Sequence, residues 1–137
     1  MEHRRDGYTI STDPARLDRG AIWRFLRSAY WSPGVSREVV ERAIDNSLVF
    51  GLYSADGSQA GFARVVTDSA RFAWLADVFV IEGHRGAGLG VWLVETIVEH
   101  PGLDSLRLVL GTADAHGLYA RFGFVPVDSA QMMERRP

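Results

Sequence analysis

The pattern of hydrophobic and polar positions switches between helical and strand spacing several times along the chain. Apolar residues at helical spacing follow Asp18 and again follow Ser36, and both residue types can cap the start of a helix. The predicted elements are, in order, a strand at Tyr8–Thr12, helices beginning at Asp18 and at Ser36, strands at Leu48–Tyr53, Gln59–Thr67 and Phe72–Ile81, a helix at Leu89–Glu99, a strand at Leu106–Leu110, a helix at Asp114–Phe122, and a last hairpin of Phe124–Val127 and Gln131–Arg135.

Two of these segments indicate how a sheet is built. Asp56-Gly57 between two strands is the strongest short-range signal of an antiparallel hairpin. Phe72–Ile81 is apolar on both faces, so we expect a central strand covered on both sides, whereas Tyr8–Thr12 is expected at an edge. We therefore predict one domain over residues 1–137 of the α/β (α+β) class. Its central sheet is mixed and flanked by helices, with right-handed helical crossovers between parallel strands.

The composition excludes several kinds of chemistry. The chain has no cysteine, so it forms no disulfide, no zinc site built on thiolates and no cysteine nucleophile. All 15 of its lysine-or-arginine positions are arginine, so no lysine forms a Schiff base or binds a phosphate in a P-loop. The net charge of -2 argues against a nucleic-acid partner, and no histidine pair has zinc-ligand spacing. Without a long apolar run or a signal peptide, we expect a cytoplasmic protein with no membrane partner.

A glycine-rich segment lies where the predicted central strand ends and an amphipathic helix begins. Glycines let a backbone approach a phosphate closely, and the free N–H groups at a helix start favour an anion. A P-loop and a dinucleotide fingerprint are both excluded, because Val91 and Trp92 stand where those motifs need other residues. A purely structural turn is the alternative to a phosphate site. The segment consists of Arg85, Gly86, Ala87, Gly88, Leu89 and Gly90.

The chain resembles the GNAT family, the GCN5-related N-acetyltransferases. Arg85, Gly88 and Gly90 match that family's coenzyme motif, and residues 76–84 resemble the strand that precedes it. Residues 115–124 resemble the second family signature, an Ala, a Tyr and a closing Gly-Phe. Two motifs at the correct separation are far more specific than one.

The resemblance implies a GNAT-like acyl-CoA N-acyltransferase fold, in which two strands splay apart and hold the acyl-pantetheine arm of acetyl-CoA. Backbone groups around Val78 and Val80 would bind the pantetheine, and the N–H of Phe79 or Val78 would polarise the thioester carbonyl. The segment 85–90 would hold the pyrophosphate. No metal is implied.

Tyr119 and Asp77 are the candidate catalytic residues. The resemblance implies that Tyr119 contacts the coenzyme and protonates the departing thiolate; a core tyrosine is the alternative. Strand alternation predicts that Asp77 shares a face with Leu75 and Phe79, where a carboxylate has either a partner or a raised pKa suited to a general base. Asp77 is therefore predicted to accept the amine proton or bind its cation, directly or through water.

The alternative for Asp77 is a structural salt bridge to Arg64 on the neighbouring strand. Trp74 is expected on the opposite face from Asp77, in the core. Tyr30 and Trp31, at the break between the first two helices, are expected to wall the acceptor pocket, where aromatic rings hold amines by packing or cation-π contact. His116 is a further substrate-site candidate that could assist proton transfer, with a surface histidine as the alternative.

The predicted function is transfer of an acetyl group from acetyl-CoA to a primary amine of an unidentified small molecule or peptide. A non-catalytic acyl-CoA-binding or sensing domain is the alternative, and a structural domain that has lost the site is a third. An exposed edge strand late in the chain would favour a homodimer.

Overall fold

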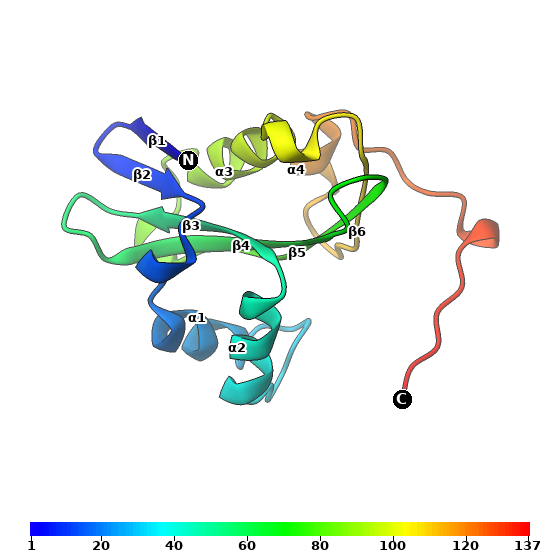
Figure 1. Cartoon of the computed structure of the whole chain (residues 1–137), viewed down its shortest axis with the longest axis horizontal. Coiled ribbons are helices and arrows are strands. Elements are labelled where there is room, and N and C mark those ends of the chain that lie inside the picture. The colour runs from blue at the N-terminus through cyan, green and yellow to red at the C-terminus, as the bar shows by residue number, and fades with distance from the viewer.

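A mixed sheet of six strands forms the centre of the computed structural model, which describes residues 1–137 (Figure 1). The strands lie across the sheet in chain order from β1 to β6, and every neighbouring pair is antiparallel except the parallel pair β5–β6. The elements are β1 (Glu2–Arg5), β2 (Tyr8–Ser11), η1 (Pro14–Arg16), α1 (Arg19–Leu26), α2 (Arg37–Asp45), β3 (Leu48–Tyr53), β4 (Gln59–Thr67), β5 (Phe72–Val80), η2 (Glu82–His84), α3 (Leu89–Val98), η3 (Pro101–Leu103), β6 (Arg107–Leu110), α4 (His116–Ala120) and η4 (Ser129–Gln131).

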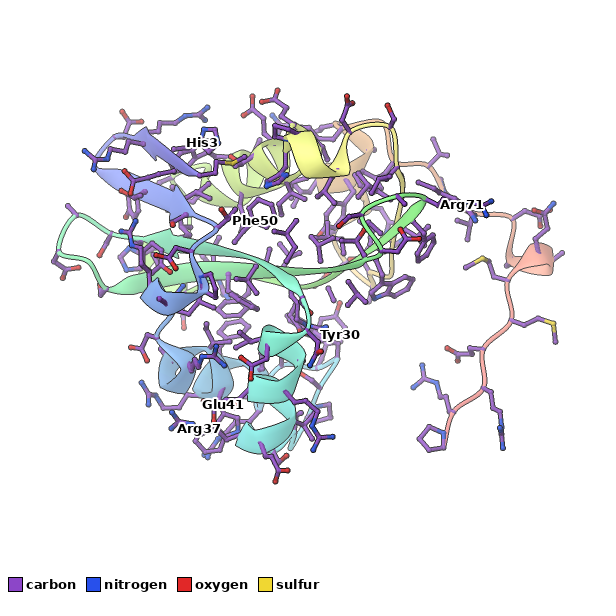
Figure 2. The ribbon with its side chains drawn as sticks, in the orientation of Figure 1. His3, Tyr30, Arg37, Glu41, Phe50 and Arg71 are labelled. Atoms are coloured by element: carbon purple, nitrogen blue, oxygen red, sulfur yellow. The ribbon has the colours of Figure 1, made fainter.

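Helices cover both faces of the sheet. Figure 1 shows α1 and α2 on one face and α3 and α4 on the other. Consecutive residues of a strand point to opposite faces, and Val49 and Phe50 illustrate this. Val49 packs in the cluster with α1 and α2, while Phe50 belongs to the cluster on the α3 side, toward which it points in Figure 2. The sheet therefore separates two hydrophobic cores, as the predicted layered α/β fold requires.

The predicted starts of the first two helices are confirmed by their caps. The Asp18 carboxylate accepts a hydrogen bond from the Ala21 N–H at 3.0 Å, and the Ser36 hydroxyl accepts one from the Val39 N–H at 3.2 Å. Each side chain satisfies a backbone donor that the first helical turn leaves free.

The prediction that Tyr8–Thr12 is an edge strand is wrong. β1 pairs with β2 along its whole length, so β2 is an inner strand. Asp6 and Gly7 both have positive φ, 51° and 84°, and they reverse the chain between the two strands. An Asp-Gly pair is the same hairpin signal that predicted the turn at Asp56-Gly57.

The predicted hairpin at the end of the chain is also wrong. No strand follows β6, and Figure 1 shows the last residues running away from the sheet. Pro126 has no N–H to donate to a strand ladder, and Met133 is 98% exposed. β6 is therefore an edge strand; the homodimer stays a prediction.

A β-bulge in β5 overturns the predicted face of Asp77. Arg64 pairs with Ala76 and Phe62 with Phe79, so one residue of β4 faces both Asp77 and Val78. Asp77 has a φ of 54°, a conformation that aspartate tolerates better than most residues. The extra residue shifts the alternation by one position. The shift separates Leu75, which packs on the α3 side, from Phe79, which packs with α1 and α2.

The predicted place of Trp74 in the core is also wrong. Trp74 is 38% exposed and lines the same cavity as Asp77 instead of pointing to the opposite face. Phe72, two residues earlier, is 39% exposed. The beginning of β5 is thus uncovered on the side of α1 and α2.

Tyr53 is the one buried side chain with an unpaired polar atom. Its hydroxyl has no hydrogen-bond partner, and its ring occupies the space that a side chain at Gly51 would need. Burial raises the pKa of Tyr53 to about 12. Between pH 10 and 12 the tyrosine therefore ionises in the unfolded chain while it stays protonated in the folded one.

We predict that the free energy of unfolding falls through this pH range by roughly 2 to 3 kcal/mol because of Tyr53. Tyr53→Phe removes this contribution, so the variant loses less stability than the wild type between pH 9 and pH 12. Denaturant unfolding at a series of pH values measures the difference. Tyr30→Phe is the matched control, since Tyr30 is 58% exposed. Parallel pH profiles for wild type and Tyr53→Phe would contradict the prediction.

Candidate functional site

The two parallel strands β5 and β6 separate partway along β5. Their pairing runs from Phe72 with Arg107 to Leu75 with Leu110, where β6 ends. β5 continues to Val80 with no partner on that side. The backbone of residues 76–80 is therefore accessible from the β6 side, at the position where the bulge also lies.

A cavity of about 570 Å³ opens at this separation. Its walls come from the loop between α1 and α2, from α2, from β5 and from the segment that follows β6. Trp31 and Asp77 line it from the side of α1 and α2, and Tyr119 of α4 lines it as well. The cavity thus joins the two faces of the sheet through the gap between the strands.

Asp77 is held by two donors at the wall of this cavity. The Arg64 Nε donates to Oδ2 at 2.9 Å, and the Trp31 Nε1 donates to Oδ1 at 2.9 Å. The side chains of Arg64 and Asp77 are only 19% and 15% exposed, so solvent screens this ion pair weakly. The salt bridge named as the alternative for Asp77 is therefore present. Each carboxylate oxygen keeps a further lone pair for a ligand or water.

Tyr30 connects the same loop to the segment after β6. Its hydroxyl donates to the Asp114 carboxylate at 3.4 Å and accepts from the Ala113 N–H at 3.3 Å. Figure 2 shows Tyr30 below the sheet, beside α2. The rings of Tyr30 and Trp31 meet edge to face with centroids 5.1 Å apart. Both aromatic residues predicted for the acceptor pocket thus lie at the cavity, 58% and 42% exposed.

Tyr119 is 8% exposed, and its ring meets Phe124 at 5.6 Å. Burial raises the pKa of Tyr119 above its ordinary value, and Tyr30 and the Asp114 carboxylate add to this effect. The hydroxyl is therefore protonated across the physiological pH range. His116, in contrast, is exposed at the start of α4 and does not line the cavity.

The glycine turn leaves space at the start of α3. Gly86 and Gly88 have φ values of 92° and 73°, a region that favours glycine. No side chain caps α3 at Gly88, and a Cβ at either glycine would point into open space. Arg85 closes the turn by donating from Nε to the Val80 carbonyl at 2.9 Å. Free N–H groups at a helix start, with open space before them, suit an anion.

His84 anchors the beginning of this turn. Its Nδ1 lies 2.9 Å from the Tyr8 hydroxyl, and the two rings meet edge to face. This contact ties the turn to β2. No group of three or more His, Asp or Glu side chains is close enough together to hold a metal ion. None of the helices is both long and apolar enough to cross a membrane.

Sequence reasoning missed Asp114. The sequence pattern predicted Asp114 as the first residue of a helix and gave it no role in a site. In the structure α4 begins at His116, and Asp114 lies in the preceding turn. The available signal was a carboxylate shortly after the carboxyl end of a buried strand, where α/β proteins place many binding residues.

Comparisons with known proteins agree with this geometry. Residues 45–126 match the family described as "Acetyltransferase (GNAT) domain". A protein of Gibberella zeae named "putative acetyltransferase" is 31% identical over 138 aligned positions, which span 85% of this chain and 78% of the relative.

Solved structures extend the comparison. A crystal structure from Xanthomonas campestris, described as a "putative acetyltransferase belonging to the gnat family", is 47% identical, with a TM-score of 0.90 and coverage of 95% of this chain and 93% of the other. A GNAT family acetyltransferase from Elizabethkingia anophelis with acetyl-CoA bound is 18% identical, with a TM-score of 0.68 over 90% of this chain and 80% of the other, and so supports the fold alone. The splayed parallel strands, the uncapped glycine turn and these relatives agree that the chain belongs to the GNAT family of acetyltransferases.

Proposed function

We propose that this protein is an N-acetyltransferase that transfers the acetyl group of acetyl-CoA to the primary amine of a small molecule or peptide. The observation that carries the proposal is the unpaired edge of β5, which leads from the cavity beside Tyr119 toward the open glycine turn that follows the strand. Use of acetyl-CoA by the GNAT family supports the choice of donor.

The coenzyme pyrophosphate would bind at the start of α3, where the N–H groups of residues 86–90 surround the open space and Ala87 and Leu89 complete the turn. Arg85 would shape the turn through its bond to Val80. The pantetheine arm would lie along the free edge of β5, against the backbone of Val78 and Val80.

The bulge region supplies the donor for the thioester carbonyl. The Ile81 N–H donates to the Ala60 carbonyl on β4, and alternation along the ladder turns the Phe79 N–H toward β4 as well. Of the two donors predicted from the sequence, we therefore assign this role to Val78, at the bulge, rather than to Phe79. A fixed N–H there would stabilise the oxyanion that forms in the transition state.

The chemistry requires two proton transfers. The amine nitrogen attacks the thioester carbon, a C–N bond forms, the C–S bond breaks, and the amine proton leaves to Asp77 directly or through a water. Tyr119 gives its hydroxyl proton to the departing thiolate, a role that its raised pKa keeps available. Trp31 and Tyr30 would contact the acceptor. His116, at the surface, would at most relay a proton to solvent.

The first prediction concerns coenzyme binding. Calorimetric titration with acetyl-CoA should show saturable binding to the wild type and none to Gly88→Glu, because the new carboxylate carries a charge that repels the pyrophosphate. Gly57→Glu is the matched control, since Gly57 also has positive φ and open space around it, but in the β3–β4 turn.

Binding that persists in Gly88→Glu would place the coenzyme elsewhere. If the wild type does not bind acetyl-CoA, the proposed function is wrong and the alternative of a structural domain that has lost the site is favoured. Binding without thiol release from any amine would favour the sensing domain.

The second prediction concerns Tyr119. Tyr119→Phe should lower kcat by about 100-fold or more, as expected for loss of a general acid, with acetyl-CoA affinity nearly unchanged. In the wild type, kcat should fall only as the pH rises above 10, because the acid must be protonated and burial raises its pKa. This alkaline limb should be absent from the variant. Stopped assays of thiol release across pH test both points, and an unchanged kcat would remove Tyr119 from the chemistry.

The third prediction concerns Asp77. Asp77→Asn should lower turnover by about 100-fold while acetyl-CoA affinity stays intact, because the variant loses the proton acceptor. Asparagine is the suitable replacement, since it tolerates the positive φ at this position. Arg64→Gln breaks the same ion pair but keeps the carboxylate, and so it should lose much less turnover. Equal losses in the two variants would assign Asp77 to the ion pair alone.

A further inference from the structure

Four charged side chains line the cavity: Arg64, Asp77, Asp114 and Arg136. Asp77 is paired with Arg64 at 2.9 Å, and Arg136 of the tail is paired with Glu134 at 2.9 Å. Asp114 also lines the cavity but forms no salt bridge, and its contacts there are the Tyr30 hydroxyl and its own turn. Asp114 is therefore the one cavity-lining carboxylate without a salt bridge, and it lies in the turn between β6 and α4.

This charge lies close to the proposed reaction centre. Tyr30 donates to Asp114, and Tyr119 lines the same cavity as both of these residues. Tyr119 in turn is the proposed proton donor to the thiolate. A cation bound at Asp114 is thus placed beside the thioester end of the coenzyme path.

The remaining wall is apolar and rich in exposed aromatic rings. Tyr30, Trp31 and Trp74 are 58%, 42% and 38% exposed, although side chains of this size are usually more buried. Val39 of α2 adds a further aliphatic surface at 51% exposure. Of the 22 lining residues, 15 are hydrophobic, so the wall fits an apolar body better than a sugar or a polyamine.

Both arginines at the cavity are already paired with carboxylates. The Arg64 guanidinium is held against Asp77 in a mostly buried pair, so it is not available to a phosphate or carboxylate on the acceptor, whereas the Arg136–Glu134 pair is 82% and 73% exposed and lies in the solvent-exposed tail. An acceptor with two cationic groups would find no second free carboxylate in the cavity, because Asp77 already pairs with Arg64.

We propose that the acceptor is an arylalkylamine, a primary amine on a short apolar chain that ends in an aromatic ring, and that Asp114 binds its ammonium group. The inference rests on the proposed N-acetyltransferase function. Trp31 and Trp74 pack against the aromatic ring, and Tyr30 orients the Asp114 carboxylate. The bound ammonium loses one proton to water before attack, and Asp77 then accepts the second proton from the attacking nitrogen.

Acceptor choice is tested by thiol release at saturating acetyl-CoA with tryptamine, phenethylamine, spermidine and glucosamine 6-phosphate. The two arylalkylamines should have kcat/KM values at least ~10-fold above the others, the discrimination expected when a polar or second charged group has no partner in the site. A preference for spermidine or the phosphosugar would overturn the inference and leave the proposed function intact. Coenzyme binding without thiol release from any amine would overturn both.

Asp114→Asn tests the ammonium site directly. The variant should raise KM for tryptamine about 10- to 100-fold, as expected for loss of a charged hydrogen bond, with acetyl-CoA affinity unchanged. Asp114→Glu keeps the charge and should restore most of the affinity. Asp104→Asn is the matched control, because Asp104 is an exposed aspartate before the start of β6, whereas Asp114 follows its end.

Titration of tryptamine into the complex with coenzyme A gives a readout independent of turnover. Binding to Asp114→Asn should be weaker by the same factor as the change in KM. A folded Asp114→Asn protein with wild-type KM and wild-type tryptamine binding would overturn the inference.

Discussion

The site depends on the point at which β5 and β6 stop pairing. Up to Leu75 and Leu110 the two strands satisfy each other's backbone groups; beyond it, β5 continues alone to Val80. Unpaired N–H and C=O groups are costly when buried without a partner. Here they face an opening that an extended, amide-containing arm such as pantetheine can fill. The glycine turn, the cavity and Tyr119 are all arranged around this opening.

The bulge at Asp77 places a carboxylate at the wall of this opening. It turns Asp77 toward the loop between α1 and α2, where Trp31 and Arg64 each donate to one carboxylate oxygen. Without the extra residue, strand alternation would put Asp77 on the same face as Leu75, on the side of α3. A second connection, from Tyr30 to Asp114, joins the same loop to the segment after β6. The loop is therefore held at both sides of the gap by aromatic donors and carboxylate acceptors, and this arrangement forms part of the cavity wall.

Most of the fold could be predicted from local signals. β3 and β4 have the predicted limits, and Asp18 and Ser36 cap α1 and α2, because these features depend on residues close in sequence. Asp6-Gly7 is also an Asp-Gly hairpin signal, and β1 was not predicted because only the signal at Asp56-Gly57 was considered. The C-terminal hairpin failed because Pro126 has no N–H to donate to a ladder and the residues around the exposed Met133 meet no apolar surface to cover them.

The sequence by itself determined the glycine turn, the position of Tyr119 after it and the aromatic pair at Tyr30 and Trp31, because short motifs and spacing encode them. Only the tertiary structure decided which charges meet. The Arg64–Asp77 pair crosses from β4 to β5, and Tyr30 reaches Asp114 across 84 residues of chain. The face of Asp77 depended on a single-residue bulge, and the exposure of Trp74 on the uncovered start of β5. A bulge changes every side-chain direction beyond it while leaving the hydrophobic pattern almost unaltered, so the pattern alone does not reveal it.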